Sequence, residues 1–166
     1  RVNEGGPVID IYRLGNAPQT AHERGFLFFT THVSDPLVAA VGNTVLDVLQ
    51  SEGLDRRAAE LGAYLSKGLR GLAERHAVIG DVRGRGLLVG LELVLDRATK
   101  QPADEVGAAV TRRCRELGLH MNVVQLPGMG GVFRIAPALT STHAELDLGL
   151  EILDRAIAET TAGDNG

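Results

Sequence analysis

The amino-acid sequence predicts an α+β domain, in which a small and mostly antiparallel sheet is covered by helices on one face. Three observations support this fold class. Two successive amphipathic segments, over 37–51 and 54–76, predict a pair of helices. A strand–turn–strand pattern follows over 78–94, and the rest of the chain combines two more helical patterns with two short apolar runs. At 166 residues the chain has the size of one ordinary domain.

The first helical pattern has a clear start and a clear stop. Pro36 suits the first turn of a helix, and Ser34 or Asp35 before it can cap the free N–H groups. Apolar residues then recur at helical spacing, and Gly53 can end the helix in a left-handed conformation. The second helix carries leucines in steps of three and four, at Leu61, Leu65, Leu69 and Leu72.

Glycines mark the turn of the predicted hairpin. Gly84-Arg85-Gly86 joins its two strands, and Leu87-Leu88-Val89 is too apolar to face water on either side, which predicts a central strand. The Gly-Arg-Gly run resembles a phosphate-binding loop only superficially, because such a loop needs a helix N-terminus directly after it. A tight turn is therefore the favoured interpretation.

The second half of the chain alternates helices and strands. A third helix is expected over 104–117, followed by strands over 119–126 and 132–135. Thr142 and Glu145 have the spacing of a capping box, which predicts the start of the last helix. The apolar side of that helix is expected to contain Leu146, Leu148, Leu150, Ile152, Leu153 and Ile157.

Composition restricts the classes of partner and site. Seventeen Lys and Arg against 21 Asp and Glu give a net charge of −4 without a long basic tract, so nucleic acid is not an expected partner. No signal peptide opens the chain and no apolar run reaches the roughly 18 residues of a membrane span, which predicts a cytoplasmic protein without membrane contact. The five histidines lack zinc-ligand spacing, and Cys114, in a predicted helix, is expected to be buried and inert.

Two stretches contain candidate binding residues. Arg134 alternates with Phe133 and Ile135 in a β-type run, so it either reaches solvent at a sheet edge or points into a cavity that needs a positive fork. The glycine-rich segment 128–131 before it either approaches a ligand with its backbone or is a flexible hairpin loop. The segment 31–35 either caps the following helix or offers oxygens to a hard cation, or N–H groups to an anion.

Three motifs of the chain can be compared with those of known families. They are Phe29-Thr30-Thr31-His32-Val33-Ser34-Asp35-Pro36-Leu37, Gly80-Asp81-Val82-Arg83-Gly84-Arg85-Gly86-Leu87-Leu88 and the segment from Asn122 to Pro137. Together they resemble the class III, pyridoxal-phosphate-dependent aminotransferases of fold type I. The resemblance covers residues 21–157, and within the family the chain is similar to the 2,2-dialkylglycine decarboxylases, which decarboxylate one substrate and transaminate another. It implies that the chain is a C-terminal piece that includes the small domain of such an enzyme.

The resemblance also implies roles for individual residues. Arg134 matches the arginine that holds the substrate α-carboxylate, and Asn122 is expected near the same pocket. Thr31 matches the threonine that reaches the phosphate of pyridoxal 5'-phosphate across a homodimer interface. Thr31, the Val33 carbonyl and the Asp35 carboxylate match the ligands of an alkali cation, normally potassium. The family also implies an amino-acid or keto-acid substrate for the full-length enzyme.

The same resemblance divides the chain into four parts. Residues 1–20 form a poorly matching tail, and 21–53 contain an interdomain strand, the cation and phosphate loop and a linker helix. Residues 54–160 form the small domain, and 161–166 are expected to fray.

The chain departs from the family in one chemical respect. The lysine that forms the Schiff base would align before Arg1, and the chain itself contains only Lys67 and Lys100. We therefore expect no catalytic residue in this chain and no activity from it alone. The alternative is a non-catalytic dimerisation or regulatory module derived from such an enzyme. Apolar residues over 26–29 would be exposed without the large domain, which predicts self-association.

Overall fold

The computed structural model describes residues 36–124 and 131–162. The chain divides into two compact units, Arg1–Asp55 and Arg56–Gly166. Helix α3 (Pro36–Ser51) belongs to the first unit, whereas the sheet and the helices that cover it belong to the second. The tail predicted over 1–20 and the strand predicted from Phe26 lie outside the described residues.

Helix α3 ends where its stop signal predicts. It is described from Pro36 to Ser51, and Gly53 follows with a φ of 61°, the left-handed conformation that stops a helix. None of its residues is buried. Its valines instead form an exposed stripe at a spacing of three and four residues, which is Val38, Val41, Val45 and Val48, called the valine stripe below.

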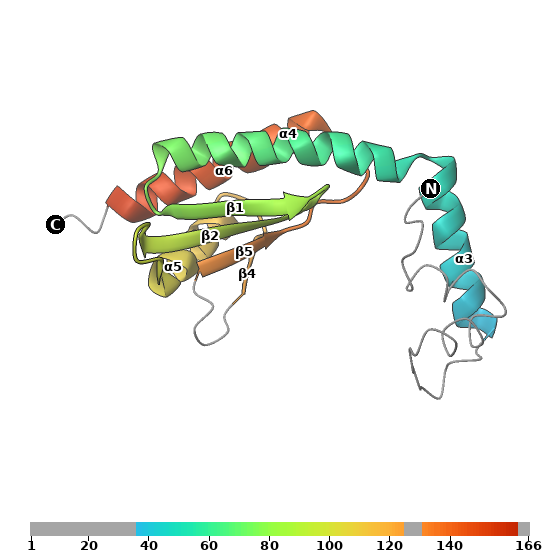
Figure 1. Ribbon diagram of the computed structural model, residues 1–166, viewed down its shortest axis with the longest axis horizontal. Helices are drawn as coiled ribbons and strands as arrows, with labels where there is room; N and C mark the ends of the chain where they lie inside the picture. The colour runs from blue at the N-terminus through green and yellow to red at the C-terminus, as the bar shows by residue number, and fades with distance from the viewer. Residues whose placement is uncertain (1–35, 125–130, 163–166) are drawn as a thin grey trace. The chain divides into compact units, whose positions relative to one another are not determined.

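The second unit is built on an antiparallel sheet (Figure 1). Its main strands are β1 (Ile79–Arg85), β2 (Leu88–Asp96), β4 (Asn122–Val124) and β5 (Gly131–Ile135). The strand order is β1-β2-β5-β4, and each neighbouring pair is antiparallel, which confirms the predicted α+β class. A two-residue strand, β3 (Gln101–Pro102), pairs with β2 and was not expected from the sequence.

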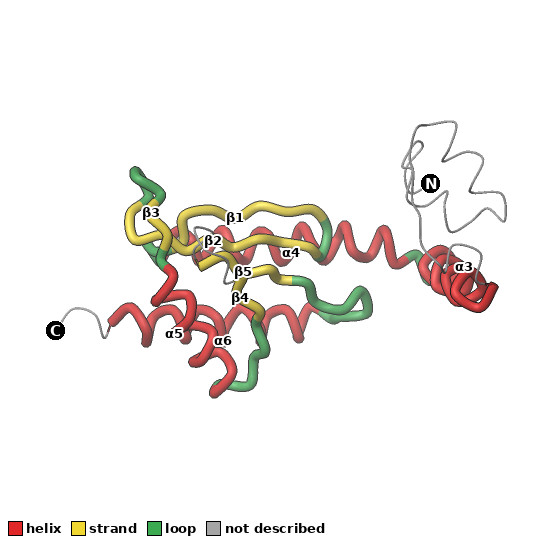
Figure 2. Tube along the Cα trace, turned by 90° about the horizontal axis from the view of Figure 1, so that it is seen from below, coloured by secondary structure: helices red, strands yellow, loops and turns green. Residues whose placement is uncertain are grey.

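One face of this sheet forms the core. Val89, Leu91 and Leu93 alternate along β2 and Phe133 lies beside them on β5, all at most 1% exposed. Burial of each of these side chains contributes about 1.5–3 kcal/mol. Three helices supply the other half of the core, which are α4 (Leu54–Arg75), α5 (Asp104–Glu116) and α6 (His143–Ala162). Figures 1 and 2 show α4 and α6 along the same side of the sheet.

Helices α4 and α6 run parallel and are joined by polar contacts along their length. Near their N-termini, Arg57 Nη2 donates a hydrogen bond to the carbonyl of Ser141 at 2.7 Å. Two turns further on, the Tyr64 hydroxyl donates to Oδ1 of Asp147 at 2.5 Å. Gly68 permits the close approach, because a Cβ there would lie 2.4 Å from the Leu150 side chain.

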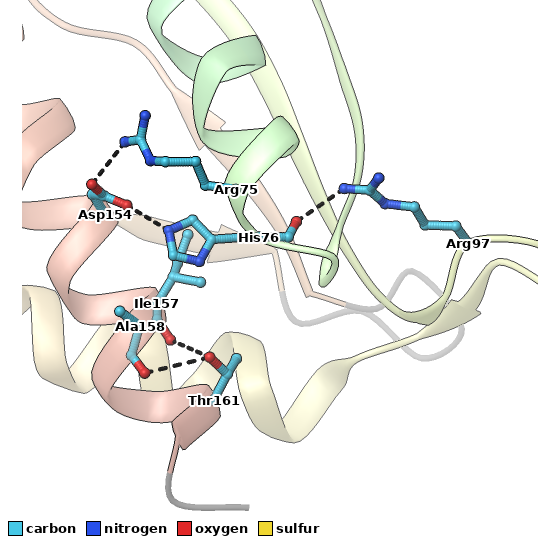
Figure 3. A network of polar contacts seen from close by, with 7 residues as sticks. All are labelled: Arg75, His76, Arg97, Asp154, Ile157, Ala158 and Thr161. Carbon is cyan, nitrogen blue, oxygen red and sulfur yellow. Dashed lines mark hydrogen bonds and ion pairs between the residues drawn. The ribbon is translucent and has the colours of Figure 1, made fainter.

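The contact continues at the C-terminal end of α4 (Figure 3). Asp154 of α6 accepts hydrogen bonds from Arg75 at 2.7 Å and from Nε2 of His76 at 2.5 Å. Arg97, which follows β2, binds carbonyl groups where α4 ends and β1 begins. Its guanidinium donates, at 2.5–3.0 Å, to the carbonyl oxygens of Ala73, His76, Ala77 and Ile79.

Several details differ from the sequence-based predictions. Leu88 is 59% exposed on the open face of the sheet, although its neighbours Leu87 and Val89 are buried, so the expectation of burial on both faces was wrong for this residue. Leu148 of α6 is 56% exposed because it lies away from the buried stripe of that helix. Helix α6 also extends to Ala162, two residues into the tail that was expected to fray. Within the described ranges, no helix is long and apolar enough to cross a membrane.

Candidate functional site

Arg134 is the only charged residue of strand β5. Phe133 before it is fully buried, Ile135 after it is partly buried, and Arg134 itself is exposed on the opposite face, as the alternation predicts. Strand β5 lies between β2 and β4, so the arginine is not at a sheet edge. It stands instead on the open face of the sheet, away from the helices.

A row of four residues crosses the open face through Arg134. Arg134 pairs with Gly90 of β2 on one side and with Asn122 of β4 on the other. Gly90 pairs in turn with Arg83 of β1. Directly opposed residues of an antiparallel sheet share one face. The two positions that the sequence predicts for substrate binding are therefore adjacent, and a second arginine lies in the same row.

The two arginines of this row differ in their partners. Arg83 Nη1 donates to Oδ2 of Asp81 and to Oε2 of Glu92, both at 2.6 Å. These hydrogen bonds raise the pKa of the Arg83 guanidinium, and the bond to Asp81 has the larger effect. Arg134 forms no hydrogen bond or ion pair within the described part of the chain. Gly90 places no side chain between them, and a Cβ there would have only atoms of Arg83 within 4 Å.

The glycine that begins β5 has a packing function. Gly131 is buried, and a Cβ at this position would lie 2.9 Å from the carbonyl oxygen of Ala103 and 3.3 Å from Gly107 of α5. The close approach is therefore to helix α5. The rest of the glycine-rich segment, 125–130, lies outside the described residues, so its interpretation as a ligand loop or a hairpin loop stays open.

The predicted Gly-Arg-Gly turn is a two-residue hairpin loop placed slightly later in the chain. Arg85 still pairs with Leu88, so the loop itself is Gly86-Leu87, and Gly86 has a φ of 56°. A Cβ on Gly62 of α4 would lie 2.2 Å from the backbone of Gly86, so the helix packs directly on this turn. A second strand follows, and the turn has no helix N-terminus to bind a phosphate.

The cysteine and the two lysines lie outside the row that contains Arg134. Cys114 is fully buried in α5, as the sequence predicts, and burial raises the pKa of its thiol to about 11. A thiol that stays protonated is a poor nucleophile. Lys67 on α4 and Lys100 in the turn before β3 are exposed. The described residues contain no group of three or more His, Cys, Asp or Glu that could hold a metal. Thr31, Val33 and Asp35 lie outside the described residues.

The charged cluster around Arg83 was not identified from the sequence. Its signal is the alternation of Asp81, Arg83 and Arg85 with apolar Val82 and with Gly84, which predicts a strand with one polar face. That alternation places Arg83 on the open face. It does not show that Arg83 and Arg134 share a row, because this depends on the register of β2 with both of its neighbours.

Comparison with known proteins assigns the chain to a family. The family model described as Aminotransferase class-III matches residues 14–157. The chain therefore belongs to the class III aminotransferases.

Three curated relatives illustrate the range of reactions in this family. The chain is 43% identical over 148 residues to an uncharacterized aminotransferase of Schizosaccharomyces pombe, covering 89% of this chain and 33% of that protein. It is 39% identical to a leucine/methionine racemase of Thermococcus litoralis, covering 82% and 30%. It is 36% identical to a taurine–pyruvate aminotransferase of Rhodobacter capsulatus, covering 93% and 34%. The chain thus spans about a third of the length of these relatives.

A solved structure of an aminotransferase shares the fold of this chain. An amine transaminase from an uncultivated Pseudomonas species, in its pyridoxal-phosphate-bound form, matches with a TM-score of 0.71 and 33% identity. The match covers 81% of this chain and 30% of that one. The shared fold is the α+β unit with its antiparallel sheet.

Proposed function

We propose that this chain forms the small-domain part of a pyridoxal-phosphate-dependent aminotransferase, in which Arg134 binds the carboxylate of an amino acid or 2-oxo acid. The observation that carries the proposal is the position of this guanidinium, exposed on an interior strand and without a partner among the described residues. A planar guanidinium can form two parallel hydrogen bonds to a carboxylate. We assign the adjacent position, Asn122, to the same site.

Pyridoxal 5'-phosphate supplies the electron sink for this class of reaction when it is bound. A covalent anchor for it must be a lysine, and the described lysines do not fit. Lys67 is exposed on α4, and Lys100 is exposed in the turn between β2 and β3. Neither belongs to the row that contains Arg134. We therefore propose that the chain binds substrate carboxylate but does not transaminate by itself, and that Thr31 contributes to holding the cofactor phosphate.

Substrate binding can be tested on the chain itself. The side-chain Nε–Hε resonance of Arg134 is expected to shift in a saturable manner when pyruvate is added to ¹⁵N-labelled protein. Arg134→Gln lacks this resonance, so the variants are compared on the backbone amide resonance of the adjacent Phe133. The saturable shift of that amide should be abolished in Arg134→Gln, since the amide side chain cannot replace a charged fork. Arg85→Gln is the matched control, because Arg85 is an exposed arginine on strand β1 of the same sheet. Equal loss in both variants would show non-specific attraction to a basic face and would contradict the proposal.

A narrower reaction is also part of the proposal. The run Phe29–Leu37 supports a 2,2-dialkylglycine decarboxylase, in which decarboxylation of one substrate is coupled to transamination of another. Thr31, the Val33 carbonyl and the Asp35 carboxylate would bind potassium, since hard cations prefer such oxygens. We expect the midpoint of thermal unfolding to be higher in potassium chloride than in lithium chloride of equal concentration. Asp35→Asn should remove that difference, and equal midpoints for the unmodified chain would exclude a potassium site.

A second function, assembly of the chain with another copy of itself, is favoured by the valine stripe of α3. Its four side chains are 42–56% exposed, and their 3-4-3 spacing matches one seam of a coiled coil. The expected result is a dimer in sedimentation equilibrium that dissociates in the double variant Val41→Asp and Val45→Asp. A monodisperse monomer of the unmodified chain would rule this function out.

A further inference from the structure

Glu92 lies between two arginines on the open face of the sheet. It is on β2, two residues beyond Gly90, and Gly90 pairs with Arg83 on one side and with Arg134 on the other. Glu92 is therefore a diagonal neighbour of both arginines, because each of them is paired with the residue two positions before it on β2. Diagonal neighbours are about 7–8 Å apart, within reach of long side chains. Each arginine is thus a possible partner for its carboxylate.

The carboxylate binds Arg83 and not Arg134. Oε2 of Glu92 accepts a hydrogen bond from Nη1 of Arg83 at 2.6 Å. The residues directly opposite Glu92 explain this choice. On β1 that residue is Asp81, which binds the same Arg83 nitrogen at 2.6 Å and holds it near Glu92. On β5 that residue is Val132, which has no group to hold the Arg134 guanidinium in place.

We propose that Arg83 is a positioning residue for the Arg134 site. By holding the Glu92 carboxylate, it keeps the Arg134 guanidinium free for the carboxylate of a substrate. Without Arg83, Glu92 becomes an internal competitor of the substrate, because Gly90 leaves no side chain that would separate it from Arg134. This inference rests on the proposed function of Arg134, and it adds a residue that acts on the substrate only through Glu92.

The test compares pyruvate binding at the Arg134 Nε–Hε resonance in a series of whole-chain variants. Arg83→Gln is expected to raise the dissociation constant about two- to fivefold, the range for a solvent-exposed ion pair. The double variant Arg83→Gln with Glu92→Gln should return to the wild-type value, and Arg83→Lys should remain close to it. An unchanged constant in Arg83→Gln would overturn the inference. A double variant that binds as weakly as the single one would also overturn it, since the effect would then be purely structural.

The two proposals can fail independently. If the unmodified chain shows no saturable pyruvate binding at Arg134, the proposed function fails. The positioning inference is then read from the hydrogen exchange of the Arg134 Nε–Hε group with water. This exchange should slow in Arg83→Gln, where Glu92 becomes the partner, and recover in the double variant. Equal exchange rates in all three proteins would overturn the inference without any ligand.

Discussion

The guanidinium of Arg97 donates a hydrogen bond to the carbonyl oxygen of His76 at 3.0 Å, although the two residues are 21 positions apart. The same side chain binds the carbonyl groups of Ala73, Ala77 and Ile79, where α4 ends and β1 begins. A helix leaves its last four carbonyl groups without partners within the helix. Arg97 therefore caps α4 from the end of strand β2 and joins the two elements.

Replacement of Arg97 is expected to destabilise the domain. Arg97→Ala should lower the free energy of unfolding by about 1–3 kcal/mol, because several hydrogen bonds from a charged donor are lost. Arg97→Lys should recover little of this loss, since one ammonium group cannot reach four carbonyls as a planar fork does. Urea unfolding measures both, with Arg85→Lys as the control for a conservative change at an exposed arginine. Wild-type stability in Arg97→Lys would contradict the capping function.

Asp154 is expected to contribute a pH-dependent part of the stability. Burial alone would raise the pKa of this carboxyl group, but the hydrogen bonds from His76 and Arg75 outweigh burial and lower the pKa below 3.8. A lowered pKa in the folded state means that the contribution is present above 3.8 and is lost as the pH falls through the folded pKa. Asp154→Asn should therefore be less stable than wild type at pH 7, and the difference should shrink in acid. A difference that is constant down to pH ~2 would exclude this linkage.

The capping box of α6 can be tested in the same way. Thr142 N donates to Oε2 of Glu145 at 2.7 Å, and Glu145 N donates to Oγ1 of Thr142 at 3.3 Å, as the sequence predicts. Thr142→Ala should cost about 0.5–2 kcal/mol of unfolding free energy. The backbone and side-chain hydrogen bonds from Thr142 lower the pKa of Glu145, so part of this stability is lost as the pH falls below 4.5. The acid dependence should be shallower in Thr142→Ala, whereas Ser in its place should retain it.

Substitution by alanine is expected to have opposite effects on stability at two glycines of α4. A Cβ on Gly62 would lie 2.2 Å from the backbone of Gly86, whereas a Cβ on Gly71 would have no atom within 4 Å. Gly62→Ala should destabilise by about 1–3 kcal/mol or more, because backbone cannot move aside as a side chain can. Gly71→Ala should stabilise by about 0.5–1 kcal/mol through helix propensity. Thermal and urea unfolding of the two variants would show changes of equal sign if the helix did not pack on the turn.

Features that depend on neighbouring residues in the chain were predictable. The end of α3 follows from Gly53, and the start of α6 follows from the pairing of Thr142 with Glu145. The alternate face of Arg134 follows from its buried neighbour Phe133. In each case the residues that carry the sequence signal lie only a few positions from the feature they predict, so no contact between distant segments is needed.

Features that depend on pairing between distant segments were not predictable. Leu88 has an apolar neighbour on each side, yet it is exposed because the helices cover one face of β2 only. Strand β3 has two residues and contains Pro102, so it has no strand signal of its own. The row that joins Arg83 with Arg134 requires the register of β2 with both β1 and β5. Sequence alternation gives the face of each residue but not its opposite partner.

Cys114 gives the chain a built-in reporter of local opening. It is the single cysteine, it has no exposed surface, and its thiol is protonated at neutral pH. A thiol-specific reagent can therefore modify it only when the packing of α5 against the sheet is transiently broken. The rate of modification measures how often this part of the domain opens under native conditions, and it does so without an added probe.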